Sequence, residues 1–79
     1  MNICKGDLYM QEYIVNLLWD AEAKVWYALN DEIPMALESE SIDILITRVK
    51  LATPELLELN GKESKCTLHF IAKRKEDVA

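Results

Sequence analysis

Two apolar segments joined by a short turn constrain the fold of this chain more than any other feature. Residues 12–19 and 24–29 are rich in β-branched and aromatic side chains, and residues 20–23 link them. Asp20 suits the first position of a turn, because its carboxylate can accept backbone N–H groups two residues further on. We therefore expect an antiparallel hairpin in which residue 19 pairs with residue 24, 18 with 25 and 17 with 26.

Both faces of this hairpin are apolar. Side chains alternate between the two faces of a strand. One face carries Tyr13, Val15, Leu17, Trp19, Trp26 and Ala28, with Lys24 at its rim. The other face carries Ile14, Asn16, Leu18, Val25, Tyr27 and Leu29. An antiparallel sheet with one solvated face alternates apolar and polar residues, and this one does not, so we predict that both faces are covered.

The rest of the predicted sheet comes from a short segment after the hairpin and from a last strand. Residues 30–32 form a cluster of turn residues, and Pro34 holds the residue before it in an extended conformation. Residues 35–38 could form a short third strand, at an edge where a nearby proline does no harm. Residues 65–75 alternate in polarity over much of their length and are predicted to form the last strand.

A single helix is predicted from residue 42 to about residue 59. Ser41 is the expected N-cap, with Ser39 as the alternative, and Asn60-Gly61 is a stop signal. Pro54 removes one backbone hydrogen bond and should kink or divide the helix near Thr53. The apolar residues of the helix fall three and four apart on one stripe: Ile42, Leu45, Ile46, Val49, Ala52 and Leu56.

Length and composition indicate one small domain. We expect residues 1–11 to be a flexible N-terminal tail and residues 12–79 to be the domain. A chain of 79 residues buries only about 60% of its unfolded surface, so a partner copy is a plausible stabiliser. The first eleven residues are not a secretory signal and no segment is long enough to span a bilayer, so we expect a cytoplasmic protein. A net charge of −5 argues against direct binding of nucleic acid.

The residues do not indicate catalytic chemistry. His69 is the only histidine, and the sequence offers it no obvious nucleophile or orienting group. Cys4 and Cys66 form neither a disulfide framework nor a zinc motif, and the glycine-rich loop of a phosphate site is absent. We therefore expect no cofactor, no metal and no enzyme activity.

The second face of the sheet has no helix to cover it. Apolar surfaces of this kind mark association sites, and a two-fold homodimer is the commonest closed arrangement. The predicted interface residues are Ile14, Leu18, Val25, Tyr27 and Leu29.

The chain resembles the HicB-like small domains, and most closely the DUF1902 family of uncharacterised bacterial proteins. The resemblance covers about residues 13–61. It is carried by Trp19-Asp20, Glu22-Ala23-Lys24-Val25-Trp26, Asp31-Glu32-Ile33-Pro34, Pro54-Glu55-Leu56-Leu57 and Asn60. It implies an α+β domain of order β-β-β-α-β, with one helix packed on a four-stranded, mainly antiparallel sheet.

The resemblance also implies a non-enzymatic, protein-binding function. Related domains are the toxin-neutralising part of HicB antitoxins, whose partner HicA is a small RNA-cleaving toxin. The family usually has glycine where Met35 stands here, so the local turn is expected to differ. A full antitoxin often carries a C-terminal DNA-binding module, and none follows before Ala79, which argues against direct DNA binding.

Two functional hypotheses follow. The first is a homodimeric, antitoxin-like module that sequesters a small basic toxin or another protein, and the acidic balance of the chain would speed that encounter. The second is a small enzyme or ligand-binding protein with its site at a subunit interface. The candidate residues for the second hypothesis are His69, Asp31 and Glu32.

Overall fold

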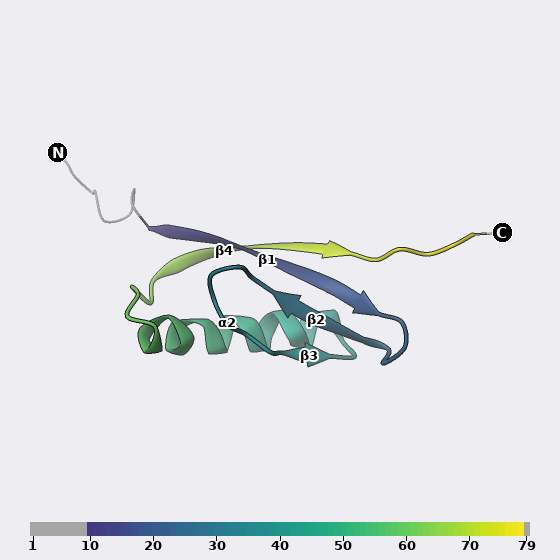
Figure 1. The fold of residues 1–79 in the computed structure, drawn as a ribbon, viewed down its shortest axis with the longest axis horizontal. Helices are drawn as coiled ribbons and strands as arrows, with labels where there is room; N and C mark the ends of the chain where they lie inside the picture. The colour runs from purple at the N-terminus through teal and green to yellow at the C-terminus, as the bar shows by residue number, and fades with distance from the viewer. Residues whose placement is uncertain (1–9, 79) are drawn as a thin grey trace.

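A computed structural model describes residues 10–78, and Figure 1 shows their arrangement. The elements follow the chain as β1 (Gln11–Asp20), β2 (Val25–Leu29), β3 (Glu38–Ser39), α2 (Ile42–Leu59) and β4 (Cys66–Lys73). The strand order in the sheet is β3-β2-β1-β4. The β1–β2 and β2–β3 pairs are antiparallel, whereas β4 lies parallel to β1. The predicted α+β fold, with one helix on a four-stranded sheet that is mainly antiparallel, is therefore confirmed.

The hairpin turn forms as expected, but its register differs from the prediction. The Asp20 carboxylate accepts the backbone N–H groups of Glu22 and Ala23, at 3.0 and 3.2 Å. Lys24 adopts a left-handed conformation, with φ of 58°, and donates its N–H to the Asp20 carbonyl at 2.7 Å. Trp19 therefore pairs with Trp26 rather than with Lys24. The predicted register was wrong by two residues, and because that shift is even, every side chain keeps its predicted face.

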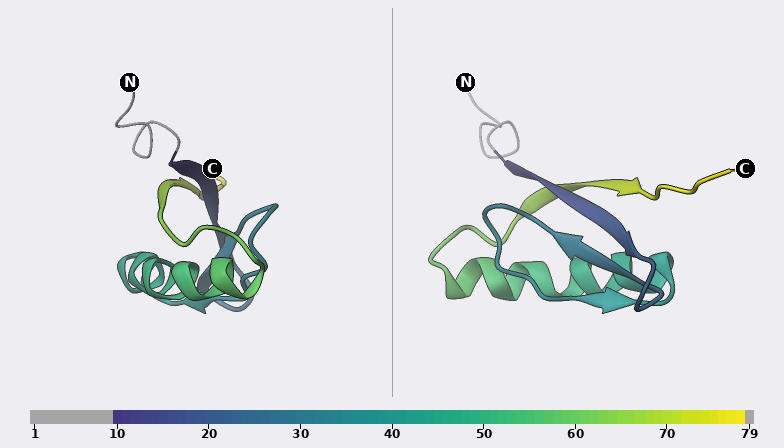
Figure 2. Two further views of the ribbon diagram at one scale, coloured as in Figure 1. Left: turned by 90° about the vertical axis from the view of Figure 1, so that its left-hand side faces the viewer. Right: turned by 45° about the vertical axis from the view of Figure 1, so that its right-hand side comes forward.

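The helix-facing side of β1 and β2 forms the core. Val15, Leu17 and Ala28 are buried against Leu45 and Val49 of the helix. A second cluster nearby holds Tyr13, Ile33 and Leu57. Figures 1 and 2 show α2 lying along one side of the strands, so the core is a single layer between the helix and the sheet.

The bounds of the helix match the prediction, and its proline does not divide it. Ile44 donates its backbone N–H to the Ser41 hydroxyl at 3.3 Å, which confirms Ser41 as the N-cap. The helix is continuous through Pro54, so the predicted division near Thr53 was wrong. Pro54 lies on the exposed side of the helix, where water can reach the carbonyl that it leaves without a backbone donor.

The buried stripe of α2 extends beyond the predicted set of apolar residues. Its buried members are Leu45, Val49, Thr53 and Leu57, whereas Ala52 and Leu56 are only half-buried. Thr53 enters the core because its hydroxyl donates to the Val49 carbonyl at 2.6 Å. A threonine satisfied within its own helix packs as a small apolar residue.

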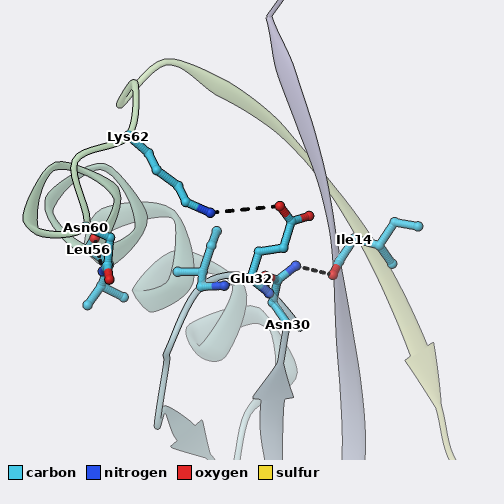
Figure 3. A network of polar contacts seen from close by, with 7 residues as sticks. Ile14, Asn30, Glu32, Leu56, Asn60 and Lys62 are labelled. Atoms are coloured by element: carbon cyan, nitrogen blue, oxygen red, sulfur yellow. Dashed lines mark hydrogen bonds and ion pairs between the residues drawn. The ribbon is translucent and has the colours of Figure 1, made fainter.

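The loop after β2 is held by one side chain. Asn30 donates its side-chain amide to the Ile14 carbonyl at 2.7 Å, and its side-chain oxygen accepts the N–H groups of Glu32 and Ile33, also at 2.7 Å (Figure 3). This arrangement places Ile33 in the core, where it is 1% exposed. The third strand is shorter and later than expected, at Glu38–Ser39 instead of 35–38, and β4 is shorter than the predicted 65–75.

Candidate protein-interaction surface

The face of the sheet opposite α2 exposes large aliphatic side chains. Ile14 is 52% exposed and Leu29 is 46% exposed. Ile71 of β4, which is 41% exposed, lies on the same face beside Asn16. Leu18, Val25 and Tyr27 are half-buried on this face. We call these six residues the open face: Ile14, Leu18, Val25, Tyr27, Leu29 and Ile71.

Five of the six residues were predicted from the hairpin alone. Ile71 was missed, because its place beside β1 depends on a parallel pairing between segments more than fifty residues apart. The single chain shows this face without a helix over it among residues 10–78, as expected. Whether a second copy covers it stays a prediction.

His69 lies at the margin of the open face, directly across from Ile14. Its Nε2 atom is 2.6 Å from Oε1 of Glu12, and both side chains are more than half exposed. No partner of His69 was visible in the sequence, since Glu12 is 57 residues away along the chain. A carboxylate orients an imidazole for acid–base chemistry, but an exposed pair also forms on many surfaces and contributes little to stability.

A small hollow beside this pair gathers the other candidate residues of the enzyme hypothesis. Its lining includes Glu12, Asp31 and Glu32, together with Ile14, Asn16 and Asn30. Glu32 also lies 3.9 Å from the Lys62 ammonium group (Figure 3). Across residues 10–78 no three His, Cys, Asp or Glu side chains are close enough together to hold a metal ion. The hollow is thus an acidic patch that suits a basic ligand surface.

The tryptophans are engaged within the chain. The Trp19 and Trp26 rings meet edge to face with centroids 5.5 Å apart, and the Arg74 guanidinium lies 4.0 Å from the centroid of Trp19. This cation–π contact occupies the Trp19 face that a nucleic-acid base would need for stacking. Trp26 also packs against the buried core cluster.

A groove opens between α2 and β4. Its walls are mainly apolar and include Ile46, Thr53, Cys66, Leu68 and Phe70. Lys50 and Lys65 also line the groove and supply its positive charge. The sequence analysis did not predict this groove.

The buried acidic groups near this groove are held in their neutral forms. Burial raises the pKa of the Cys66 thiol. Burial is also the main cause of the raised pKa of Tyr13, and the charges of Glu32 and Cys66 raise it further. A raised pKa keeps the thiol protonated at neutral pH and so makes it a poor nucleophile. Cys4, the other cysteine, lies outside the described residues, as does most of the predicted N-terminal tail.

Within residues 10–78, no helix has the length and apolar character needed to cross a membrane. The groups gathered around the open face are aliphatic at its centre and acidic at one margin.

Comparisons with known proteins agree with this fold. A crystal structure of the hypothetical protein TTHA1013, from the extremely thermophilic bacterium Thermus thermophilus, matches with a TM-score of 0.68 and 30% sequence identity. The match covers 87% of this chain and 99% of that one. No curated protein matches the chain. The family model described as a domain of unknown function, DUF1902, matches residues 12–79, and the chain therefore belongs to the DUF1902 family.

Proposed function

We propose that this protein is a non-enzymatic, HicB-like binding module that acts as a homodimer in the bacterial cytoplasm. In this proposal it neutralises a small basic toxin by sequestering it, as an antitoxin does. The observation that carries the proposal is the open face, which leaves Ile14, Leu29 and Ile71 between 41% and 52% exposed.

Burial of this face would contribute favourable free energy to association. Full burial of a Leu or Ile side chain is worth roughly 1.5–3 kcal/mol, so each half-exposed residue has about 1 kcal/mol still to gain. The three most exposed residues together give about 3 kcal/mol per copy, and two copies give about 6 kcal/mol. A small domain has a total stability of this same order, so the contact would matter to the fold as well as to binding.

Charge supports a basic partner. The chain carries a net charge of −5, and Glu12, Asp31 and Glu32 line a hollow at the margin of the open face. Complementary charge raises association rates and disfavours partners of the wrong sign. A toxin that binds and cleaves RNA would itself be basic, which fits this margin.

The test places a charge within the open face. Leu18→Asp and Tyr27→Asp should split the homodimer, because a carboxylate buried against an apolar partner surface loses its hydration. Ile14→Lys is the gentler variant, since Ile14 is already half exposed in the single chain. Leu51→Asp is the matched control, because Leu51 is 76% exposed on the helix, away from this face.

Light scattering gives the mass of each variant, and circular dichroism confirms that it is folded. We expect the wild type and Leu51→Asp to be dimeric or larger and the folded Ile14→Lys variant to form a smaller assembly than either. A wild-type chain that remains monomeric at high concentration would refute the use of the open face. Repeated failure to capture a small basic protein from the native host would refute the antitoxin part.

The pairing of His69 with Glu12 beside the acidic hollow favours the second hypothesis, a small enzyme or ligand-binding protein. In that case the site would use His69, Asp31 and Glu32 at a subunit interface. A ligand that raises the melting temperature of the wild type, but not of His69→Ala, would favour this hypothesis over the first. Direct nucleic-acid binding forms no part of either one.

A further inference from the structure

Strand β4 presents an unprotected edge. It pairs with β1 on one side, and among residues 10–78 no strand pairs with its other side. Residues 66–72 contain no Asp, Glu, Lys or Arg. Exposed edges are usually blunted by such charges, because free backbone N–H and C=O groups recruit another strand. The edge of β4 is therefore suited to pairing.

The chain continues beyond β4 as a projecting segment. Residues 74–78 are exposed and lead away from the sheet, as Figure 1 shows at the C-terminal end. The radius of gyration is 15.0 Å and the longest dimension is 57 Å. A compact domain of this length would have a radius of gyration of about 11–12 Å. The single chain is thus extended along the direction of β4.

The groove between α2 and β4 lies beside the first half of that strand. Cys66, Leu68 and Phe70 line it and are half-buried, so their outer surfaces still face solvent. Lys50 and Lys65 give the groove positive charge. Residues 76–78, with the sequence Glu-Asp-Val, bring two carboxylates and one apolar side chain that suit this end of the groove, whereas Arg74 and Lys75 before them are basic.

The projecting segment does not reach the far half of its own groove. From Lys73 back to Cys66 is seven residue steps, or about 23 Å at the rise of a β-strand. The five residues from 74 to 78 span at most about 17 Å. Residues 74–78 can therefore lie along this part of the groove only in another copy of the chain.

We infer that β4 pairs edge to edge, in antiparallel fashion, with β4 of a second copy, and that residues 74–78 of each copy lie along the groove of the other. The extended strand would then run from Cys66 to Val78, with Ala72 at its middle. A two-fold axis beside Ala72 pairs all thirteen residues. Val78 of one copy lies opposite Cys66 of the other, and Glu76 lies opposite Leu68.

The side-chain faces agree with this register. Residues directly opposite each other in a sheet point to the same face. The even-numbered residues of β4 face the helix, since Leu68 pairs with Tyr13 and Phe70 with Val15 of the core. Val78 then covers apolar surface near Cys66. The Glu76 carboxylate, which accepts a hydrogen bond from Arg74 Nε in the single chain, turns toward Lys50 and Lys65 instead. The small side chain of Ala72 allows close approach at the axis.

This contact uses the edge of the sheet, whereas the proposed homodimer uses the open face. The two contacts are compatible, and the edge contact does not rest on the antitoxin proposal. An Ile14→Lys background removes association through the open face and leaves the edge unchanged. Tests in that background separate the failure of one contact from the failure of the other.

The decisive experiment uses the native cysteine in the groove. Val78→Cys is made together with Cys4→Ser, so that Cys66 and the new thiol are the reactive groups. Residues directly opposite on antiparallel strands have Cα atoms about 4.5–5.5 Å apart, which is within the range for a disulfide. Mild oxidation should therefore give a covalent dimer on a non-reducing gel. Adding Cys66→Ala should abolish it.

Leu59→Cys in the same Cys4→Ser background reports random collisions, because Leu59 is 76% exposed at the end of the helix. A second variant ends the chain after Lys73, and its dimer dissociation constant should rise at least tenfold. The inference is overturned if Val78→Cys gives no more covalent dimer than Leu59→Cys. It is also overturned if Val78→Cys gives only a disulfide within one chain, or if the shortened chain dissociates at the same concentration as the full chain.

Discussion

The Asn30 side chain should be the most important single polar group for the stability of this fold. It makes three hydrogen bonds, each 2.7 Å long, which join the end of β2, the middle of β1 and the loop that delivers Ile33 to the core (Figure 3). Asn30→Ala removes all three. A typical hydrogen bond contributes about 0.5–1.5 kcal/mol, and the half-buried site lets water replace part of that. We expect a loss of about 2 kcal/mol in the free energy of unfolding.

Asn30→Asp separates the roles of the two ends of this side chain. The carboxylate keeps the acceptor for the Glu32 and Ile33 N–H groups and loses the donor to the Ile14 carbonyl. Its second oxygen faces the Ile14 carbonyl and joins Glu12, Asp31 and Glu32 around the same hollow, so we expect a cost at least as large as that of Asn30→Ala. Asn60→Ala is the control, because Asn60 is exposed and donates one side-chain hydrogen bond, to the Leu56 carbonyl at 2.8 Å. Its cost should be about 0.5 kcal/mol.

Urea unfolding followed by circular dichroism measures these differences, at one fixed protein concentration because association would shift the midpoint. In thermal unfolding, 2 kcal/mol corresponds to a fall in melting temperature of about 8–16 °C for a domain of this size. An Asn30→Ala variant within 0.5 kcal/mol of the wild type would refute the assigned role. So would an Asn30→Asp variant as stable as the wild type.

Two further predictions concern Tyr13 and Pro54. Burial raises the pKa of the Tyr13 hydroxyl in the folded chain above its ordinary value of about 10. As the pH rises, the hydroxyl therefore ionises in the unfolded chain first. The free energy of unfolding falls from about pH 10 until the pH passes the pKa of the folded chain. Tyr13→Phe should therefore lose less stability than the wild type between pH 9 and pH 11, and equal losses in urea midpoints would contradict this. Pro54→Ala restores a backbone N–H donor in the middle of a continuous helix. The free energy of unfolding should therefore rise by about 1–3 kcal/mol. A fall in the melting temperature would show that proline is preferred at this position.

The features that the sequence predicted correctly depend on neighbouring residues. The helix bounds follow from Ser41, which caps the first turn, and from Asn60-Gly61, where Gly61 has a positive φ of 70°. The division of hairpin residues between two faces follows from strict alternation, which a two-residue change of register leaves intact. These signals act over a few residues, so no tertiary information is needed to interpret them.

The features that were missed depend on distant pairing or on unusual backbone. Lys24 takes a left-handed conformation normally favoured by Gly or Asn, so the true turn left no signal in the residue type. The partner of His69 follows from the parallel register of β1 and β4. Thr53 is polar by composition, and it enters the buried stripe because its hydroxyl is satisfied by its own helix. None of these follows from local pattern alone.

The fold and the proposed associations are carried by alternate residues of the same strands. Val15 is fully buried under the helix, and Ile14 beside it is half exposed on the open face. In β4, Leu68 and Phe70 pack at the margin of the core, while among residues 10–78 no strand pairs with the outer edge of β4. A substitution on the open face should therefore change association with little effect on the single chain, whereas one at Val15 should unfold it. The helix α2 covers one side of a sheet that is apolar on both sides. Alternate residues of the same strands therefore stabilise the domain on the covered side and leave surfaces suited to a partner elsewhere.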